Sequence, residues 1–308
     1  MASMITMFLQ SAYSMIDGLF VSNLIGDTAL SAVNVAWPII AVVTAIGTGV
    51  GCGGAVMMST KQGEGKNEES NIVRANVILA LLASSIVVTI LFLILLTPLL
   101  KLMGAEGELL RLSQIYGRVM LTGGVLQILS CGLTPLLRND NRAVSAMMIM
   151  VGGLFANLGL DFVFMYVFHI GIGGAAGASL CAQLFTTVCC LMILYTKKTD
   201  PIRLSQFMIR KEYWKKIFKT AVSPFGISLT PSLLILYHNV ACLKFGGDLA
   251  VNAYALISST VGSYRVLLIG VAEGIQPLAS YAYGAHDFHA IRKIRNKAII
   301  TAIGVSFF

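Results

Sequence analysis

Long apolar stretches dominate the sequence and limit the folds open to it. A helix needs about 20 mostly apolar residues to cross the hydrocarbon core of a bilayer. Inside lipid every backbone group must be bonded within the protein, so such stretches form helices rather than loops. The sequence therefore predicts an all-α integral membrane protein with eight spans and a ninth that begins at residue 297. The predicted spans are residues 2–24, 32–59, 72–97, 113–137, 144–168, 172–195, 217–245 and 251–283.

The charged residues predict how the chain is oriented in the membrane. Only 12% of the residues are charged and the net charge is +8. Of the 22 basic residues, 17 fall in alternate segments between the spans, near residues 66, 140, 205 and 290. Short loops rich in Lys and Arg stay in the cytoplasm. We therefore expect a multi-pass plasma-membrane protein with a cytoplasmic N-terminus, and not a nucleic-acid-binding protein.

An internal repeat divides the chain into two halves. A shift of 221 residues without a gap gives nine identities between residues 26–63 and 247–284, several of them glycine. Both copies begin in the same orientation, which is typical of parallel repeats in two-lobed transporters. The identical pairs are Gly26/Gly247, Asp27/Asp248, Ala29/Ala250, Ala32/Ala253, Gly49/Gly270, Val50/Val271, Gly53/Gly274, Ser59/Ser280 and Gly63/Gly284.

The repeat predicts the domain organisation. Residues 1–195 form a six-helix N-lobe, 196–216 a cytoplasmic linker, and 217–308 a partial C-lobe with helices seven to nine. The linker is the longest polar stretch, and its basic and apolar residues are typical of a segment that lies along the membrane surface. If each half holds six spans, the chain stops in the third span of its second half. We therefore expect a fragment that lacks the C-terminal helices and does not transport by itself.

Three carboxylates fall inside predicted spans, where a charge is costly and marks a functional position. They are Asp17, Asp161 and Glu273. Gln10, Tyr13 and Asp17 follow an i, i+3, i+7 spacing and share one helix face. Asn157 and Asp161 lie four residues apart and share a face of another helix. Two polar stripes on apolar helices predict a shared interior cavity.

Four segments resemble the multidrug and toxic compound extrusion (MATE) transporters. "QSAYSMIDGLFVSNLIGDTALSAVNVAWP" (10–38) is similar to their first two helices, and "NLGLDFVF" (157–164) to an Asn-x-x-x-Asp pattern in the fifth. "GIGGAAGAS" (171–179) resembles the start of their sixth helix. "EGIQPLASYAYGAHD" (273–287) resembles a signature of the eighth, with Ala282 where Asn is usual. The resemblance covers essentially the whole chain.

The resemblance implies a coupling site in the N-lobe. This site for a proton or cation maps onto Gln10, Tyr13, Asp17, Asn157, Asp161 and Ser179. Ser179 stands where Thr is common and keeps the hydroxyl. Na⁺ would bind at Asp17, Asn157, Asp161 and Ser179, whereas H⁺ would exchange between the two carboxylates.

Further candidates line the cleft that such transporters have between their lobes. The family's acidic position in helix seven has no carboxylate here. His238 is paired with Asp17 by the 221-residue shift and is the titratable group nearest that role. Its alternative role is that of an ordinary helix histidine with a satisfied hydrogen bond. Glu273 and Asn34 are the other candidates.

The function implied is ion-coupled multidrug efflux, in which organic cations leave in exchange for H⁺ or Na⁺ by alternating access. The alternative is a flippase for lipid-linked precursors, which shares the architecture. An aspartyl protease is disfavoured, because Ile16-Asp17 and Leu160-Asp161 lack the Tyr-Asp and Gly-x-Gly-Asp motifs of those enzymes. We expect a monomer that is not an enzyme, with no cofactor and no metal site apart from the Na⁺ alternative. The six cysteines show no Cys-x-x-Cys spacing.

Overall fold

The computed structural model describes residues 6–7, 9, 24–196 and 206–306, and their regular structure is helical throughout. Predicted site residues Gln10, Tyr13 and Asp17 lie outside the described residues. The helices are α2 (Asp27–Gly63), α3 (Asn67–Leu102), α4 (Gly107–Thr122), α5 (Gly124–Asn139), α6 (Ala143–Asp161), the π-helix η1 (Phe162–Val167), α7 (Ile172–Tyr195), α8 (Lys211–Gly284) and α9 (Phe288–Ser306).

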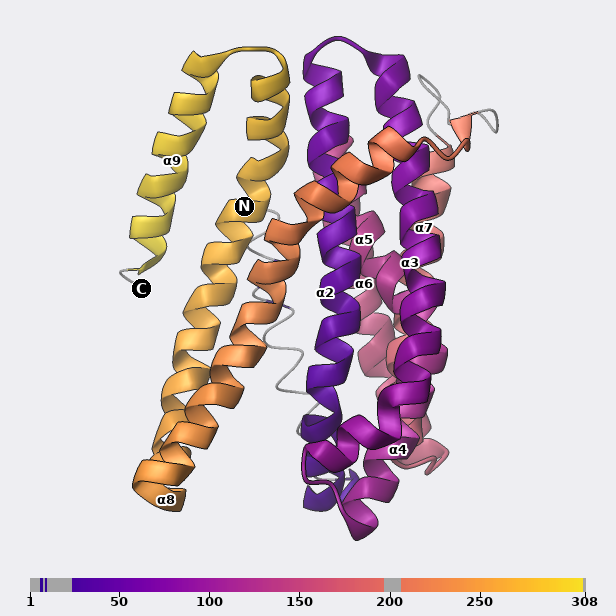
Figure 1. Cartoon of the computed structure of the whole chain (residues 1–308), viewed down its shortest axis with the longest axis vertical. Coiled ribbons are helices and arrows are strands. Elements are labelled where there is room, and N and C mark those ends of the chain that lie inside the picture. The colour runs from indigo at the N-terminus through magenta and orange to yellow at the C-terminus, as the bar shows by residue number, and fades with distance from the viewer. Residues whose placement is uncertain (1–5, 8, 10–23, 197–205, 307–308) are drawn as a thin grey trace.

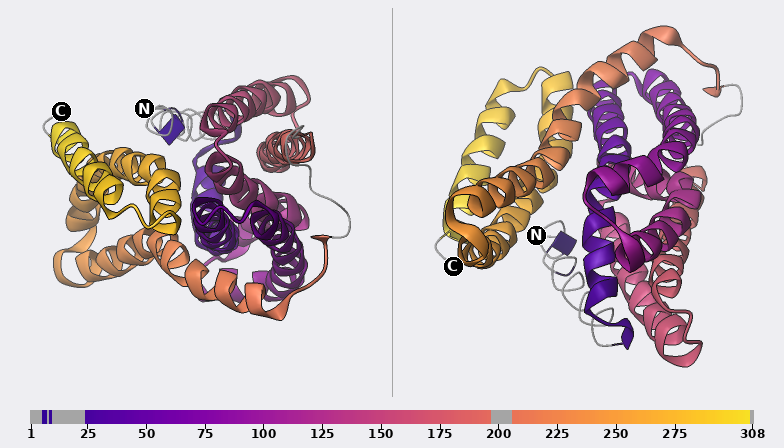
Figure 2. Two further views of the ribbon diagram at one scale, coloured as in Figure 1. Left: turned by 90° about the horizontal axis from the view of Figure 1, so that it is seen from above. Right: turned by 60° about the horizontal axis from the view of Figure 1, so that its bottom comes forward.

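The helices form two groups. Figure 1 shows α2 to α7 as one bundle, with most of α8 and all of α9 standing beside it. The groups meet at the end that carries the α2–α3 and α8–α9 loops, and they diverge toward the other end. The view from above in Figure 2 shows the same separation. The predicted all-α, two-lobed architecture is confirmed.

Helix α8 is a single run of helical hydrogen bonding, 74 residues long. At 1.5 Å per residue a straight helix of this length would measure about 110 Å, far more than the ~30 Å of a bilayer core. Figure 1 shows that its ribbon descends, turns and returns, so α8 comprises two limbs. The predicted spans 217–245 and 251–283 fall on these limbs. The helix already begins at Lys211, so the end of the predicted linker is helical.

Fewer helices than predicted have the length and apolarity of a membrane span. Four described helical segments qualify, or five if the pair α4–α5 counts as one span. That pair is bent by 57° at Gly123, although the sequence predicts one span over 113–137. Helix α8 is not among them and carries Lys244, Arg265 and Glu273 along its length. The first predicted span lies mostly outside the described residues.

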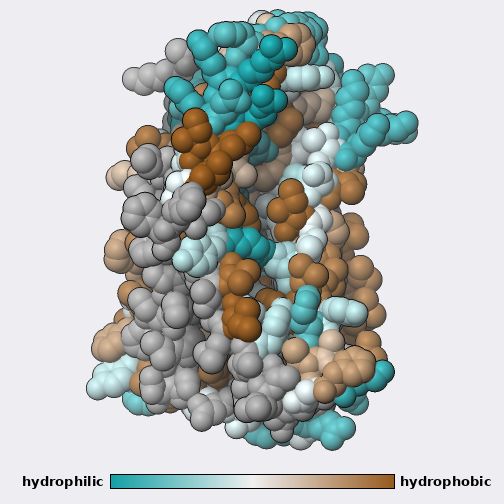
Figure 3. All heavy atoms as spheres, turned by 90° about the vertical axis from the view of Figure 1, so that its left-hand side faces the viewer, coloured by the Kyte–Doolittle hydropathy of each residue, from teal (hydrophilic) through white to brown (hydrophobic). Residues whose placement is uncertain are grey.

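The bundle buries apolar side chains inside and presents others outside. Ile40, Leu81 and Leu133 are among the fully or almost fully buried core residues. By contrast Ile94 on α3 is 71% exposed. On the face in Figure 3 hydrophilic side chains gather at the end where the lobes meet, above a mainly hydrophobic band. Exposed apolar side chains of this kind are what lipid tails contact.

Two glycines lie at a close backbone contact between the two lobes. A Cβ added to Gly63 on α2 would lie 2.1 Å from the carbonyl oxygen of Tyr281 on α8. A Cβ added to Gly284 would lie 2.0 Å from the carbonyl oxygen of Thr60. Thr60 and Tyr281 are related by the same 221-residue shift that relates the two glycines. The contact between the lobes is therefore reciprocal, and we call it the glycine crossing.

A buried polar cluster ties α2, α3 and α5 together near the same end. Arg74 Nη2 lies 3.1 Å from Asp140 Oδ1, and both side chains are almost fully buried. Gln62 Nε2 donates to the same oxygen over 3.2 Å. Ser59 Oγ donates to Asn139 Oδ1 over 2.9 Å. Arg74 lies near the start of the predicted span 72–97 and Asp140 lies just after the predicted span 113–137, and inside the bundle each charge is balanced by the other.

Candidate functional site

Asp161 and Asn157 form a buried polar pair inside the N-lobe. Both lie on α6, and Asn157 Nδ2 donates a hydrogen bond to Asp161 Oδ2 over 3.1 Å. Asp161 is 0% exposed and Asn157 is 5% exposed. Their spacing of four residues places them on one face, as the sequence predicts. A carboxylate and an amide in this arrangement offer oxygen ligands to a hard cation or a carboxyl that binds a proton.

A change of helix type occurs at the same point. Helix α6 ends at Asp161, and the π-helix η1 continues from Phe162 to Val167. Short π-helical turns inside α-helices occur frequently at functional sites, because the wider turn redirects side chains and leaves backbone groups less regularly bonded. The carboxylate of Asp161 thus lies at a discontinuity in its span.

The other predicted site residues are found in different environments. Ser179 lies on α7, which packs against α6, and its side chain is partly buried. Asn34 lies on α2 and is exposed. His238 is exposed on α8, its Nδ1 lies 2.8 Å from the carbonyl oxygen of Leu234, and its ring stacks on Tyr254 at 5.0 Å.

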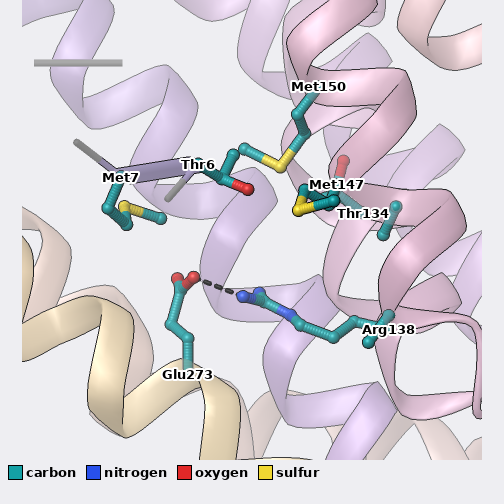
Figure 4. A pocket seen from close by; sticks show the side chains of 9 residues that line it. Thr6, Met7, Thr134, Arg138, Met147, Met150 and Glu273 are labelled. Carbon is teal, nitrogen blue, oxygen red and sulfur yellow. Dashed lines mark hydrogen bonds and ion pairs between the residues drawn. The ribbon is translucent and has the colours of Figure 1, made fainter. Parts of the chain in front are cut away.

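Glu273 connects the two lobes through an ion pair that the sequence does not reveal. Its Oε2 lies within bonding distance of Arg138 Nη1, at the end of α5 (Figure 4). The Glu273 side chain is 19% exposed and that of Arg138 is 7% exposed. Arg138 lies one position beyond the predicted span 113–137. A carboxylate inside a span requires a cation nearby, so the sequence indicates that a partner exists but does not identify Arg138.

This ion pair forms one wall of a small pocket between the lobes. Figure 4 shows the side chains around it, which come from α5, α6, α8 and the start of the chain. Apart from the ion pair the lining is apolar or carries a hydroxyl, and three of its members are methionines. The lining residues are Thr6, Met7, Thr134, Arg138, Ala143, Ala146, Met147, Met150 and Glu273. Among the described residues no group of three or more His, Cys, Asp or Glu side chains is placed to hold a metal ion.

The loop after α2 carries its own balanced charges. Glu64 Oε2 lies 2.9 Å from Lys61 Nζ and 3.0 Å from Lys66 Nζ. The hydrogen bonds from Lys61 and then Lys66 lower the pKa of Glu64 to about 2. A carboxyl with this pKa stays ionised at every pH above about 3, so Glu64 gives no source for a pH dependence near neutrality.

Comparison with protein families gives a match over most of the chain. The family model described as MatE matches residues 2–163 and 227–308. The multidrug export protein MepA of Staphylococcus aureus (strain N315) is 25% identical over 310 residues, covering 99% of this chain and 67% of MepA. MepA of Staphylococcus saprophyticus subsp. saprophyticus is 24% identical over 302 residues, covering 97% of this chain and 66% of that protein. This chain therefore spans about two thirds of the length of these relatives.

Solved structures agree with this assignment. A MATE protein crystallised in the straight conformation has a TM-score of 0.93 at 26% identity, over 99% of this chain and 69% of its own. An outward-facing multidrug resistance MATE family transporter of the MOP superfamily also has a TM-score of 0.93 at 26% identity, over 99% of this chain and 68% of its own. The family match and the shared fold lead to one conclusion: the chain belongs to the MatE family of multidrug efflux transporters.

Proposed function

We propose that this protein exports organic cations in exchange for H⁺ or Na⁺ by alternating access. The observation that carries the proposal is the fully buried carboxylate of Asp161, bonded to Asn157 within an apolar helix. A buried carboxyl group with an amide beside it offers oxygen ligands to Na⁺, and the same group can instead hold a proton. Asp17, Tyr13 and Gln10 complete the proposed site, with Ser179 as a further ligand.

The lobes supply the proposed movement. In this structure they meet at the end with the basic loops, which we propose is cytoplasmic, and diverge at the other end. This shape supports an outward-open state. An ion bound at Asp161 shifts the balance between outward- and inward-open states only if it binds one of them more tightly. The N-lobe (1–195) would carry the ion, the linker 196–216 would join the lobes, and the transporter would act as a monomer.

The coupling role is tested by Asp161→Asn in the protein as the cell makes it, including any sequence that flanks these 308 residues. The amide keeps the shape but neither exchanges a proton nor offers a full negative charge. We expect loss of gradient-driven efflux of a fluorescent cation, with normal amounts of protein in the membrane because an amide is cheaper to bury than a carboxylate. Efflux from vesicles is measured under an imposed H⁺ or Na⁺ gradient and normalised to protein.

The matched control is Glu108→Gln, since Glu108 is an exposed carboxylate paired with Arg111. It should transport normally. Asp17→Asn should behave like Asp161→Asn. Normal driven efflux in both Asn variants would overturn the coupling role, and low protein levels with normal activity per molecule would indicate a structural role instead.

The proposed orientation has a separate test. Single cysteines at Asn67 and His289, both exposed and at the end with the basic loops, should resist membrane-impermeant maleimide added outside intact cells. A cysteine at Glu106, exposed in the loop between α3 and α4, should react readily. The experiment needs a background without the six native cysteines. The opposite labelling pattern would invert the topology.

A further inference from the structure

We infer that Glu273 binds the cationic group of the exported molecule and that Arg138 is a tethered competitor that displaces it. This inference rests on the proposed function and adds to it a substrate site and a means of release. The class of ligand is a singly charged organic cation with an apolar body. The inference starts from the ion pair between the lobes and the pocket beside it.

The first step concerns where the two charges reside. Arg138 belongs to α5 in the N-lobe and Glu273 to the returning limb of α8, 135 residues further along the chain. Their contact exists only while the lobes are together at this end. The contact uses Arg138 Nη1 alone, and Arg138 Nε has no hydrogen-bond partner among the described residues. A single-point pair separates more readily than the two-bond fork that Arg forms with carboxylates elsewhere.

The second step concerns the state in which the lobes part at this end. Arg138 then moves away with the N-lobe, and Glu273 is left without its cation on the surface that the lobes had covered. A carboxylate beside apolar side chains attracts another cation more strongly than a carboxylate in bulk water does, because the local dielectric constant is lower. Asp140 is close to Arg138 in sequence, but its carboxylate is already bonded to Arg74 and Gln62. Asp140 therefore has its own cation.

The third step concerns what kind of cation fits. The pocket beside Glu273 is lined by Met7, Met147 and Met150, and Glu273 is the one carboxylate among its described lining residues. Methionine side chains are flexible and polarisable, and they adapt to apolar molecules of different shapes. A small hydrated ion gains little from them, whereas an organic cation gains contact for its body and a counter-charge for its head.

These steps give an exchange at one carboxylate. With the lobes parted, Glu273 holds the organic cation. When the lobes close, Arg138 returns to Glu273, and the cation loses its counter-charge and leaves toward the opposite, open side. The two cations compete for the same oxygen atoms, so binding of one requires loss of the other.

The test is equilibrium binding of tetraphenylphosphonium to purified protein without any ion gradient. Arg138→Gln removes the competitor, and we expect binding to tighten by about fivefold or more, the low end of typical coupling between sites. Arg138→Lys keeps a competing cation and should bind like the wild type. Glu273→Gln should bind at least about tenfold more weakly, a factor equal to about 1.4 kcal/mol. The double variant Arg138→Gln/Glu273→Gln should be as weak as Glu273→Gln alone.

The control is Arg142→Gln, because Arg142 is near in sequence but donates to the carbonyl oxygen of Ile193 within the N-lobe. It should leave binding unchanged. If Arg138→Gln fails to fold, the double variant still tests the inference, because it leaves neither charge of the pair without its partner. Binding by the double variant as tight as that of the wild type would overturn the inference.

The outcomes also separate this inference from the proposed function. Unchanged or weaker binding in a folded Arg138→Gln protein overturns the competitor role but leaves gradient-driven efflux and its dependence on Asp161 untouched. Absence of binding to the wild-type protein would overturn both the site at Glu273 and the export of organic cations.

Discussion

Replacement of Arg74 by methionine is expected to destabilise the protein by about 3–5 kcal/mol, because it leaves the buried carboxylate of Asp140 without its cation. The Arg74–Asp140 contact is 3.1 Å long, and both side chains are shielded from solvent. Methionine is unbranched and keeps the packing of the inner part of the arginine side chain, so the loss reports mainly on charge. The measurement is the thermal unfolding midpoint of the purified protein in mild detergent.

Two variants make this result interpretable. Arg111→Met breaks the exposed pair with Glu108, 2.7 Å long, and should leave the unfolding midpoint almost unchanged, because solvent screens the pair. The double variant Arg74→Met/Asp140→Asn removes both buried charges and should recover a large part of the lost stability. A single Arg74→Met variant as stable as Arg111→Met would show that the buried pair does not hold α3 to the end of α5.

The second large effect is expected at the glycine crossing. Gly284→Ala adds a Cβ 2.0 Å from the backbone oxygen of Thr60, where no flexible side chain is able to yield. The two helices must move apart, at a cost of about 1–3 kcal/mol. If the lobes exchange between two states, the whole cost falls on the state closed at this end, so its population should decrease about 5- to 150-fold relative to the open state.

The population is measured by pulsed electron paramagnetic resonance. Spin labels are attached to cysteines at Asn67 and His289, which are exposed on α3 and α9, in a background without native cysteines. The variant should show more of the longer distance than the unsubstituted protein does. Gly226→Ala is the control, because a Cβ there meets nothing within 4 Å. Identical distance distributions for Gly284→Ala and the control would contradict the expected effect.

Apolar length alone predicts several helices well. The predicted span 172–195 coincides with α7, and 72–97 lies within α3, because an apolar segment in a bilayer has no alternative to a helix. The bend between α4 and α5 is not predictable in this way. Gly123 and Gly124 are apolar enough to continue a span, and only the structure shows that they lie close to the side chains of Leu180 and Thr89 at the bend.

One part of the candidate site is predictable from the sequence and another part is not. The Asn157–Asp161 pair is predictable because four residues make about one helical turn, so local geometry alone brings the side chains together. The partner of Glu273 is not predictable, since Arg138 is distant in sequence and resembles a loop residue at the end of an apolar stretch. Arg74 shows the same limit. From the sequence, a charged residue near the end of a span is expected to be exposed, and only the three-dimensional structure shows its buried partner.

The glycine crossing also has the form of a contact between two copies of one chain. Gly63 meets Tyr281 and Gly284 meets Thr60, so each half offers the other the same pair of positions. An isologous interface of a homodimer about a two-fold axis has this property. The halves of the protein thus meet as two fused protomers would. A substitution made in a common half-length ancestor would have altered both contacts at once, whereas each is now free to change alone, which allows the two lobes to become unequal.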